Sequence, residues 1–143
     1  MFSVCNAYNQ VPTTGRVVDT TATWINPTAS GMLNNSAGNR VSVVSCNGTM
    51  PLSAEIYQRI QTAANGAVAY VALVMNGTTG QSSNSSRGLM IQSTAAMDQI
   101  SVARADEVPP LGLNYIQVTQ FNSGSQTFVG TSLDQRLVAS WQY

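Results

Sequence analysis

The sequence predicts one all-β domain over residues 1–143, of the sandwich, barrel or jelly-roll type. Short runs in which β-branched and aromatic residues alternate with polar ones recur roughly every dozen residues. Gly, Asn, Pro and Ser separate these runs, as expected for turns. With 143 residues and 43% hydrophobic content, the chain is long and apolar enough to bury a core.

The first three expected strands end at turn residues. Residues 2–8 (FSVCNAY) place apolar side chains at alternate positions. Residues 16–25 (RVVDTTATWI) form a second strand that an Asn-Pro pair ends. Residues 40–46 (RVSVVSC) form a third, which stops at an Asn-Gly pair.

The middle of the chain predicts two further strands and a loop. Residues 53–62 (SAEIYQRIQT) could be read as a helix, but Ala54, Ile56 and Ile60 fall at even spacing and favour a strand. Residues 67–75 (AVAYVALVM) are almost wholly apolar between two Asn-Gly pairs. That pattern favours a central strand covered on both faces over a short buried helix. The polar stretch TTGQSSNSS that follows predicts an unpacked loop.

Five more segments carry the strand pattern. The Pro109-Pro110 pair precedes the third of these segments, residues 113–121, and predicts a loop there. These segments are residues 87–93, 98–103, 113–121, 126–130 and 137–143.

Charge and composition exclude several functions. Only 8% of the residues are charged: six are Arg, six are Asp or Glu, and Lys and His are absent. A neutral chain without a basic cluster is a poor nucleic-acid binder. Without histidine there is no Ser-His-Asp triad and no histidine metal site. No run of about 18 apolar residues is present, so we expect no membrane span. The first ten residues lack the basic and apolar regions of a signal peptide.

The acidic residues and cysteines do not indicate catalysis or a bound cofactor. Asp106 and Glu107 are adjacent, and beside two prolines they are expected in a solvated loop. Asp98 and Asp134 also stand in loop-like contexts, and no calcium-loop pattern occurs. We therefore expect no enzyme, no metal and no cofactor. Cys5 and Cys46 can form a disulfide, although two buried thiols is the interpretation we favour.

Three stretches resemble the tumour necrosis factor/complement globular-head superfamily. AYVALVMNGTTG (69–80) is similar to the strand and turn "aromatic-Val-Ala-Leu-x-x-Asn-Gly" of that family. VSVVSCNGTMPLSAEIYQR (41–59) resembles the strands that precede it, and LGLNYIQVTQFNSGSQTF (111–128) resembles a later segment, although Gly-Leu-Asn stands where the family has Gly-Asp. The resemblance covers residues 40–143.

The resemblance implies an antiparallel jelly-roll β-sandwich that assembles as a tight homotrimer. The family includes secreted ligands and complement heads, and also knob domains at the tips of bacteriophage and viral fibres. One such knob belongs to the trimeric tail needle of short-tailed phages. A surface built from Ser, Thr, Asn and Gln, without Lys or His, favours the virion branch.

We therefore expect the distal knob of a trimeric phage tail needle or viral fibre, in the virion and extracellular after release. It would stabilise the fibre tip and contact the host surface during attachment and genome delivery. The alternatives are a secreted complement- or TNF-like module, whose gene would carry an upstream collagen-like or signal segment, and a carbohydrate-binding β-sandwich. The latter would present aromatics in a groove beside Asn or Asp.

Four residues are candidates for clefts between subunits. Arginine suits partly buried ion pairs and the recognition of carboxylates. Arg59 and Arg104 either pair within the chain, with Glu55, Asp106 or Glu107, or bind a neighbour's carboxylate or a small anionic ligand. Tyr70 and Tyr115 are the aromatic candidates, with packing in the core or at a subunit interface as their simpler role. The apolar strand that contains Tyr70 needs cover on both faces, which a second subunit could supply.

Overall fold

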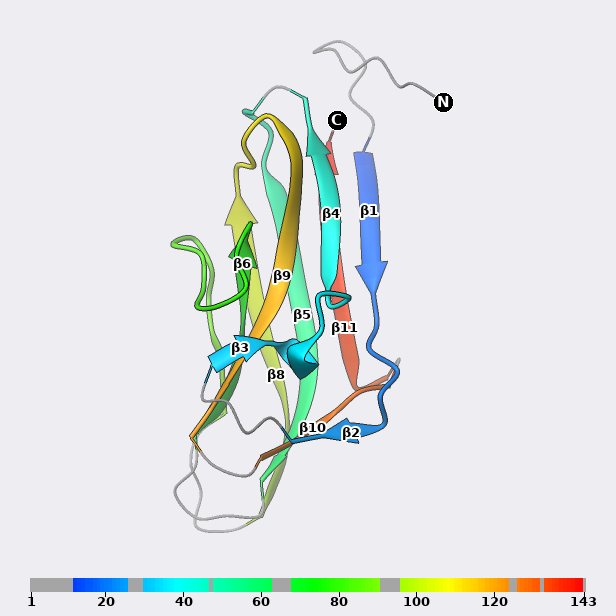
Figure 1. The fold of residues 1–143 in the computed structure, drawn as a ribbon, viewed down its shortest axis with the longest axis vertical. Helices are drawn as coiled ribbons and strands as arrows, with labels where there is room; N and C mark the ends of the chain where they lie inside the picture. The colour runs from blue at the N-terminus through cyan, green and yellow to red at the C-terminus, as the bar shows by residue number, and fades with distance from the viewer. Residues whose placement is uncertain are drawn as a thin grey trace.

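The computed structural model describes residues 12–25, 30–46, 48–62, 68–90, 96–123, 126–131 and 133–142. Their strands form two curled antiparallel sheets that pack face to face as a sandwich (Figure 1). Sheet A consists of β1 (Pro12–Val17), β2 (Thr23–Trp24), β5 (Leu52–Thr62), β8 (Met97–Glu107), β10 (Gln126–Val129) and β11 (Gln135–Gln142). Sheet B consists of β3 (Ser30–Met32), β4 (Arg40–Ser45), β6 (Ala69–Met75), β7 (Gly88–Met90) and β9 (Gly112–Asn122), and the short 3-10 helix η1 (Leu33–Asn35) follows β3.

The strand pairs are nested within one another along the chain. The innermost pair is β6 with β7, enclosed in sequence by β5 with β8, then by β4 with β9, and finally by β1 with β11. The pairs alternate between the sheets, so that β1-β11-β5-β8 run side by side in sheet A and β4-β9-β6-β7 in sheet B.

Alternation along each strand divides the side chains between the core and the outside. In β5, every second residue from Leu52 to Ile60 is buried, and the residues between them are partly or fully exposed. The inward side chains of both sheets form one hydrophobic cluster, with Phe128, Leu33 and Leu73 among its largest members. The alternation of apolar and polar residues therefore determines which side chains of each sheet face outward, where they can contact a partner.

Several predicted strands are confirmed, with shifted ends. The helix alternative for 53–62 is wrong, because that segment is the central strand β5. The strands expected at 40–46, 67–75, 87–93, 113–121, 126–130 and 137–143 correspond to β4, β6, β7, β9, β10 and β11. The strand expected at 2–8 lies outside the described residues.

Three expectations about strands and loops are corrected. The single strand expected at 16–25 is two, because the Asp19 carboxylate accepts the backbone N–H of Thr21 (2.9 Å) and forms a turn between β1 and β2. The strand expected at 98–103 runs from Met97 to Glu107 as β8, so Asp106 and Glu107 lie in a strand rather than in a loop, and Asp98 lies inside the strand rather than in a loop-like context. Its continuous pairing with β5 overrides the local turn signals.

The third correction concerns the polar stretch after β6, which packs against the sandwich. The backbone N–H of Ser82 donates to Leu73 O (2.9 Å), and that of Ser86 donates to Arg104 O (2.7 Å) on the free side of β8. A Cβ at Gly88 would lie 2.7 Å from the backbone of Val102, so the close approach to β8 requires glycine there. This segment therefore covers the edge of sheet A.

Cys46 is disulfide-bonded, which corrects the favoured interpretation of a buried thiol at this position. The other cysteine of the sequence, Cys5, lies outside the described residues. Within the described ranges, no helix is both long and apolar enough to cross a bilayer.

Candidate functional site

The outer face of sheet B is partly covered by the chain itself. Thr119 points outward from β9 yet is buried, and its hydroxyl donates to Gly80 O (2.6 Å) in the loop after β6. Gln117 also points outward and is buried, and its amide donates to Asn39 O (2.9 Å). Ala72 on β6 is buried beneath the same cover. The cover expected from a second subunit over β6 is thus supplied in large part by the same chain.

The outer face of sheet A is open by contrast. Among the described residues, no outward-facing side chain of β5, β8 or β11 is buried. A shallow pocket of about 450 Å³ lies on this face. Its lining consists of Ser53, Ala54, Glu55, Tyr57, Arg104, Asp106, Arg136, Val138 and Ser140. Apolar Ile100, 60% exposed, extends the face along β8.

Charges on the face of sheet A are balanced. Four arginines and four carboxylates occur on it. Three of the carboxylates belong to β5 and β8, and the fourth, that of Asp134, reaches the face from the turn before β11. They are Arg16, Arg59, Arg104, Arg136, Glu55, Asp98, Asp106 and Asp134. The face is therefore neutral while holding charges of both signs.

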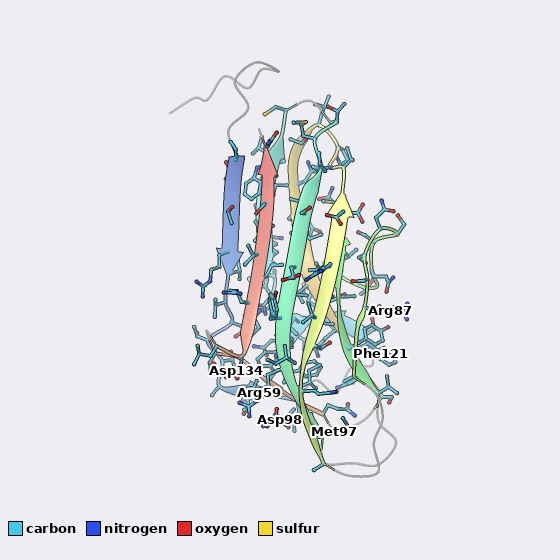
Figure 2. The ribbon with its side chains drawn as sticks, turned by 180° about the vertical axis from the view of Figure 1, so that it is seen from behind. Arg59, Arg87, Met97, Asp98, Phe121 and Asp134 are labelled. Carbon is cyan, nitrogen blue, oxygen red and sulfur yellow. The ribbon has the colours of Figure 1, made fainter. Side chains whose placement is uncertain are left out.

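Arg59 joins three parts of sheet A. Its guanidinium lies 2.6 Å from Asp98 on β8 and 3.2 Å from Asp134 before β11. Figure 2 shows the three side chains together toward one end of the sheet. Hydrogen bonds from Arg59 and then Gln61 lower the pKa of Asp98 to about 2. The pKa of Asp134 is also lowered, by the Thr131 hydroxyl and, against some burial, by Arg59.

The pocket is organised around Tyr57. Arg104 forms an ion pair with Glu55, and the guanidinium of Arg136 lies 5.4 Å from the ring centroid of Tyr57. A hydrogen bond to Tyr57, and then one from Arg104, holds the pKa of Glu55 below its usual value despite partial burial. Asp106 accepts a hydrogen bond from the Ser53 hydroxyl. The pocket therefore offers paired donors and acceptors with no excess charge.

Two other arginines lie on the outer face of sheet B, each stacked on a tyrosine. Arg87 lies 5.0 Å from the ring centroid of Tyr70, and Arg40 lies 4.9 Å from that of Tyr115. The ring of Tyr70 also stacks on Phe121, at 4.9 Å between centroids. All six acidic residues of the sequence are described, and neither Arg40 nor Arg87 forms an ion pair with any of them.

The four candidate residues do not come together within one chain. Arg59 and Arg104 lie on the outer face of sheet A, whereas Tyr70 and Tyr115 lie on that of sheet B. Intrachain pairing is confirmed for Arg104 with Glu55, but Arg59 pairs with Asp98 and Asp134 instead of the expected acids.

Sequence reasoning missed the arginines that stack on tyrosine. Arg40, Arg87 and Arg136 each lie over a tyrosine from another strand or segment. The only available signal was the absence of Lys and His, which leaves arginine as the sole cation for every role. Strand pairing decides which tyrosine each arginine meets, and that pairing joins segments far apart in sequence.

Among the described residues, no three Asp, Glu or Cys side chains gather into a group that could hold a metal ion. Comparison of the chain with family models, with curated proteins and with solved structures gives no match. The function is therefore argued from the fold and from its two outer faces.

Proposed function

We propose that this chain is the distal knob of a trimeric phage tail needle or viral fibre. It stabilises the fibre tip and contacts the host surface during attachment and genome delivery. The nesting of the four strand pairs across two sheets supports this proposal, because a long hairpin rolled into a jelly roll has that pattern. The proposal also agrees with the family that the sequence resembles.

The open face of sheet A is the observation that carries the assembly. It is neutral, it combines paired charges with the exposed side chain of Ile100 and the half-buried one of Val138, and the described part of the chain leaves it uncovered. In a trimer the contact between neighbours is heterologous, so a positive part of this face on one copy can meet a negative part of it on the next. Because sheet B is partly covered already, association through sheet A leaves the covered, loop-bearing face toward the outside.

Molar mass measured by light scattering over a dilution series tests this assembly. We expect three times the 15.1 kDa chain mass, maintained as the protein is diluted. Val138→Glu replaces an apolar side chain between Arg16 and Glu55 with a further carboxylate on the face of sheet A and should shift the protein to monomers. Val44→Glu makes the same change on the outer face of sheet B, where Val44 is 50% exposed, and should leave the mass unchanged.

A wild-type chain that is monomeric at every concentration would refute the trimer and with it the knob. A trimer that Val44→Glu dissociates while Val138→Glu does not would move the interface to sheet B.

A further inference from the structure

The two faces of the sandwich differ in charge although the chain is neutral. The outer face of sheet B carries Arg40 and Arg87 and no acidic residue. Four of the six acids lie on the face of sheet A. Of the remaining two, Glu107 points inward from β8, and Asp19 is held by the amides of Asn34 (3.0 Å) and Asn39 (2.7 Å). The face of sheet B therefore has a net charge of about +2, taking each arginine as fully protonated.

Arg87 belongs to a ladder that crosses three elements. Because β6 lies between β9 and β7 in sheet B, Tyr70 on β6 stands between Phe121 on β9 and Arg87 just before β7. Figure 2 labels Arg87 and Phe121 together at one side of the molecule, away from Arg59. Gln81 accepts a hydrogen bond from the Arg87 side chain and so fixes its orientation. The ring edges of such a stack carry partial positive charge, which adds to that of the guanidinium.

Arg40 and Tyr115 form a second station on the same face. Tyr115 and Phe121 point to the same side of β9 and are six residues apart, which corresponds to roughly 20 Å at the rise of an antiparallel strand. The polar loop after β6 lies between them, over Thr119.

We propose that this face binds an acidic polysaccharide, with a sugar carboxylate on Arg87 and the sugar ring against the edges of Tyr70 and Phe121. A further carboxylate of the same polymer reaches Arg40. The number and spacing of the cations favour this partner over two others. Nucleic acid carries one charge per about 1.7 Å, and anionic membranes are recognised by clusters of about four to eight cations. Two cations, held beside rings whose positions on β9 are roughly 20 Å apart, instead match a polymer whose carboxylates are separated by sugar rings and accompanied by many hydroxyls. The inference rests on the proposed contact with a host surface.

Isothermal titration of the full chain with oligogalacturonate tests the proposal, with uncharged malto-oligosaccharide of equal length as the comparison. We expect binding to the acidic oligomer alone. Arg87→Gln should weaken it about tenfold, which corresponds to the loss of one charge-assisted hydrogen-bonded contact. Val108→Gln, at a 54% exposed position between β8 and β9 and outside the strands of both sheets, is the control and should change affinity less than twofold.

Length dependence provides a second readout. Arg40→Gln should weaken binding of a long oligomer while leaving that of a disaccharide, too short to span both stations, unchanged. Equal binding of the acidic and neutral oligomers, no binding of either, or an unchanged affinity in Arg87→Gln would overturn the proposal. Light scattering on the same samples reports the oligomeric state, so a failure of sugar binding is distinguishable from a failure of the knob assignment.

Discussion

Arginine is the only cation available to this chain, and it serves two roles. On sheet A, Arg59 and Arg104 form ion pairs that join neighbouring strands. On sheet B, Arg40 and Arg87 lie over tyrosine rings and form no ion pair with the acids of the chain. A guanidinium suits both roles because it is planar, always charged and weakly hydrated. The same residue type therefore neutralises one face and leaves the other positive.

The Arg59 cluster makes stability depend on pH in the acid range. The folded pKa of Asp98, about 2, lies below its ordinary value of 3.8. A lowered folded pKa contributes stability that is complete above the ordinary pKa and is lost as pH falls through the folded one. The stability difference between wild type and Asp98→Asn should therefore be greatest at neutral pH and shrink from pH 4 to pH 2. Urea unfolding across that range measures it.

The control is the NMR titration of Asp98 in the wild type and in Arg59→Gln. Removal of the guanidinium should return the pKa of Asp98 toward 3.8. A native Asp98 that already titrates near pH 4 would show that the pairing has no thermodynamic effect.

Arg59 was a candidate for an ion pair from the sequence, but its partners could not be predicted. Asp98 is 39 residues away and Asp134 is 75, and both were assigned to loops. Only the pairing of β5 with β8 on one side and with β10 and β11 on the other brings them together. Local patterns carry no information about such long-range registers.

At the scale of elements, buried glutamines connect the sheets across the core. The Gln120 side chain on β9 accepts the indole N–H of Trp24 on β2 (3.1 Å) and the backbone N–H of Asn34 in η1 (3.1 Å). Gln120 is 1% exposed and Trp24 is 9% exposed. One amide oxygen thus satisfies two donors from elements that belong to different layers.

Gln120→Leu should lower the free energy of unfolding by about 1–3 kcal/mol, because buried donors lose their acceptor. Denaturant unfolding measures the loss. Gln142→Leu, at an exposed position, should change stability by less than about 0.5 kcal/mol. Adding Trp24→Phe removes the indole donor while keeping a ring to stack on Phe128. The double variant should therefore lose less than the sum of the two single losses, and strict additivity would contradict the bond.

Strands with a clear apolar pattern in their own sequence were predictable, whereas strands that exist because a distant strand pairs with them were not. The central strand β5 followed from period-two spacing, and β6 from its apolar run between turns. β3 has only three residues, Ser30–Met32, and exists because β9 offers it a partner. The loop after β6 packs because Ser82 and Ser86 form hydrogen bonds with β6 and β8 through both backbone and hydroxyl groups, and composition does not reveal these partners.

At the scale of the whole molecule, the disulfide at Cys46 constrains the chain at the end of β4. Constraining the unfolded chain in this way typically contributes about 2–4 kcal/mol. We expect reductant to lower the thermal midpoint of the wild type. Cys46→Ser should show the lowered midpoint without reductant and no further response to it. Equal midpoints in all four samples would contradict a stabilising disulfide.

The nested pairing also has a consequence for how the chain folds during synthesis. The partner of β1 is β11, the last strand, and β5 receives β11 and β10 along the whole of one side. The inner pair β6 and β7 can meet early, but sheet A lacks a central member until β11 (Gln135–Gln142) has been synthesised. Contacts this distant in sequence favour slow folding. A nascent chain must therefore carry an incomplete sheet with exposed strand edges until β11 emerges and joins β1 to β5.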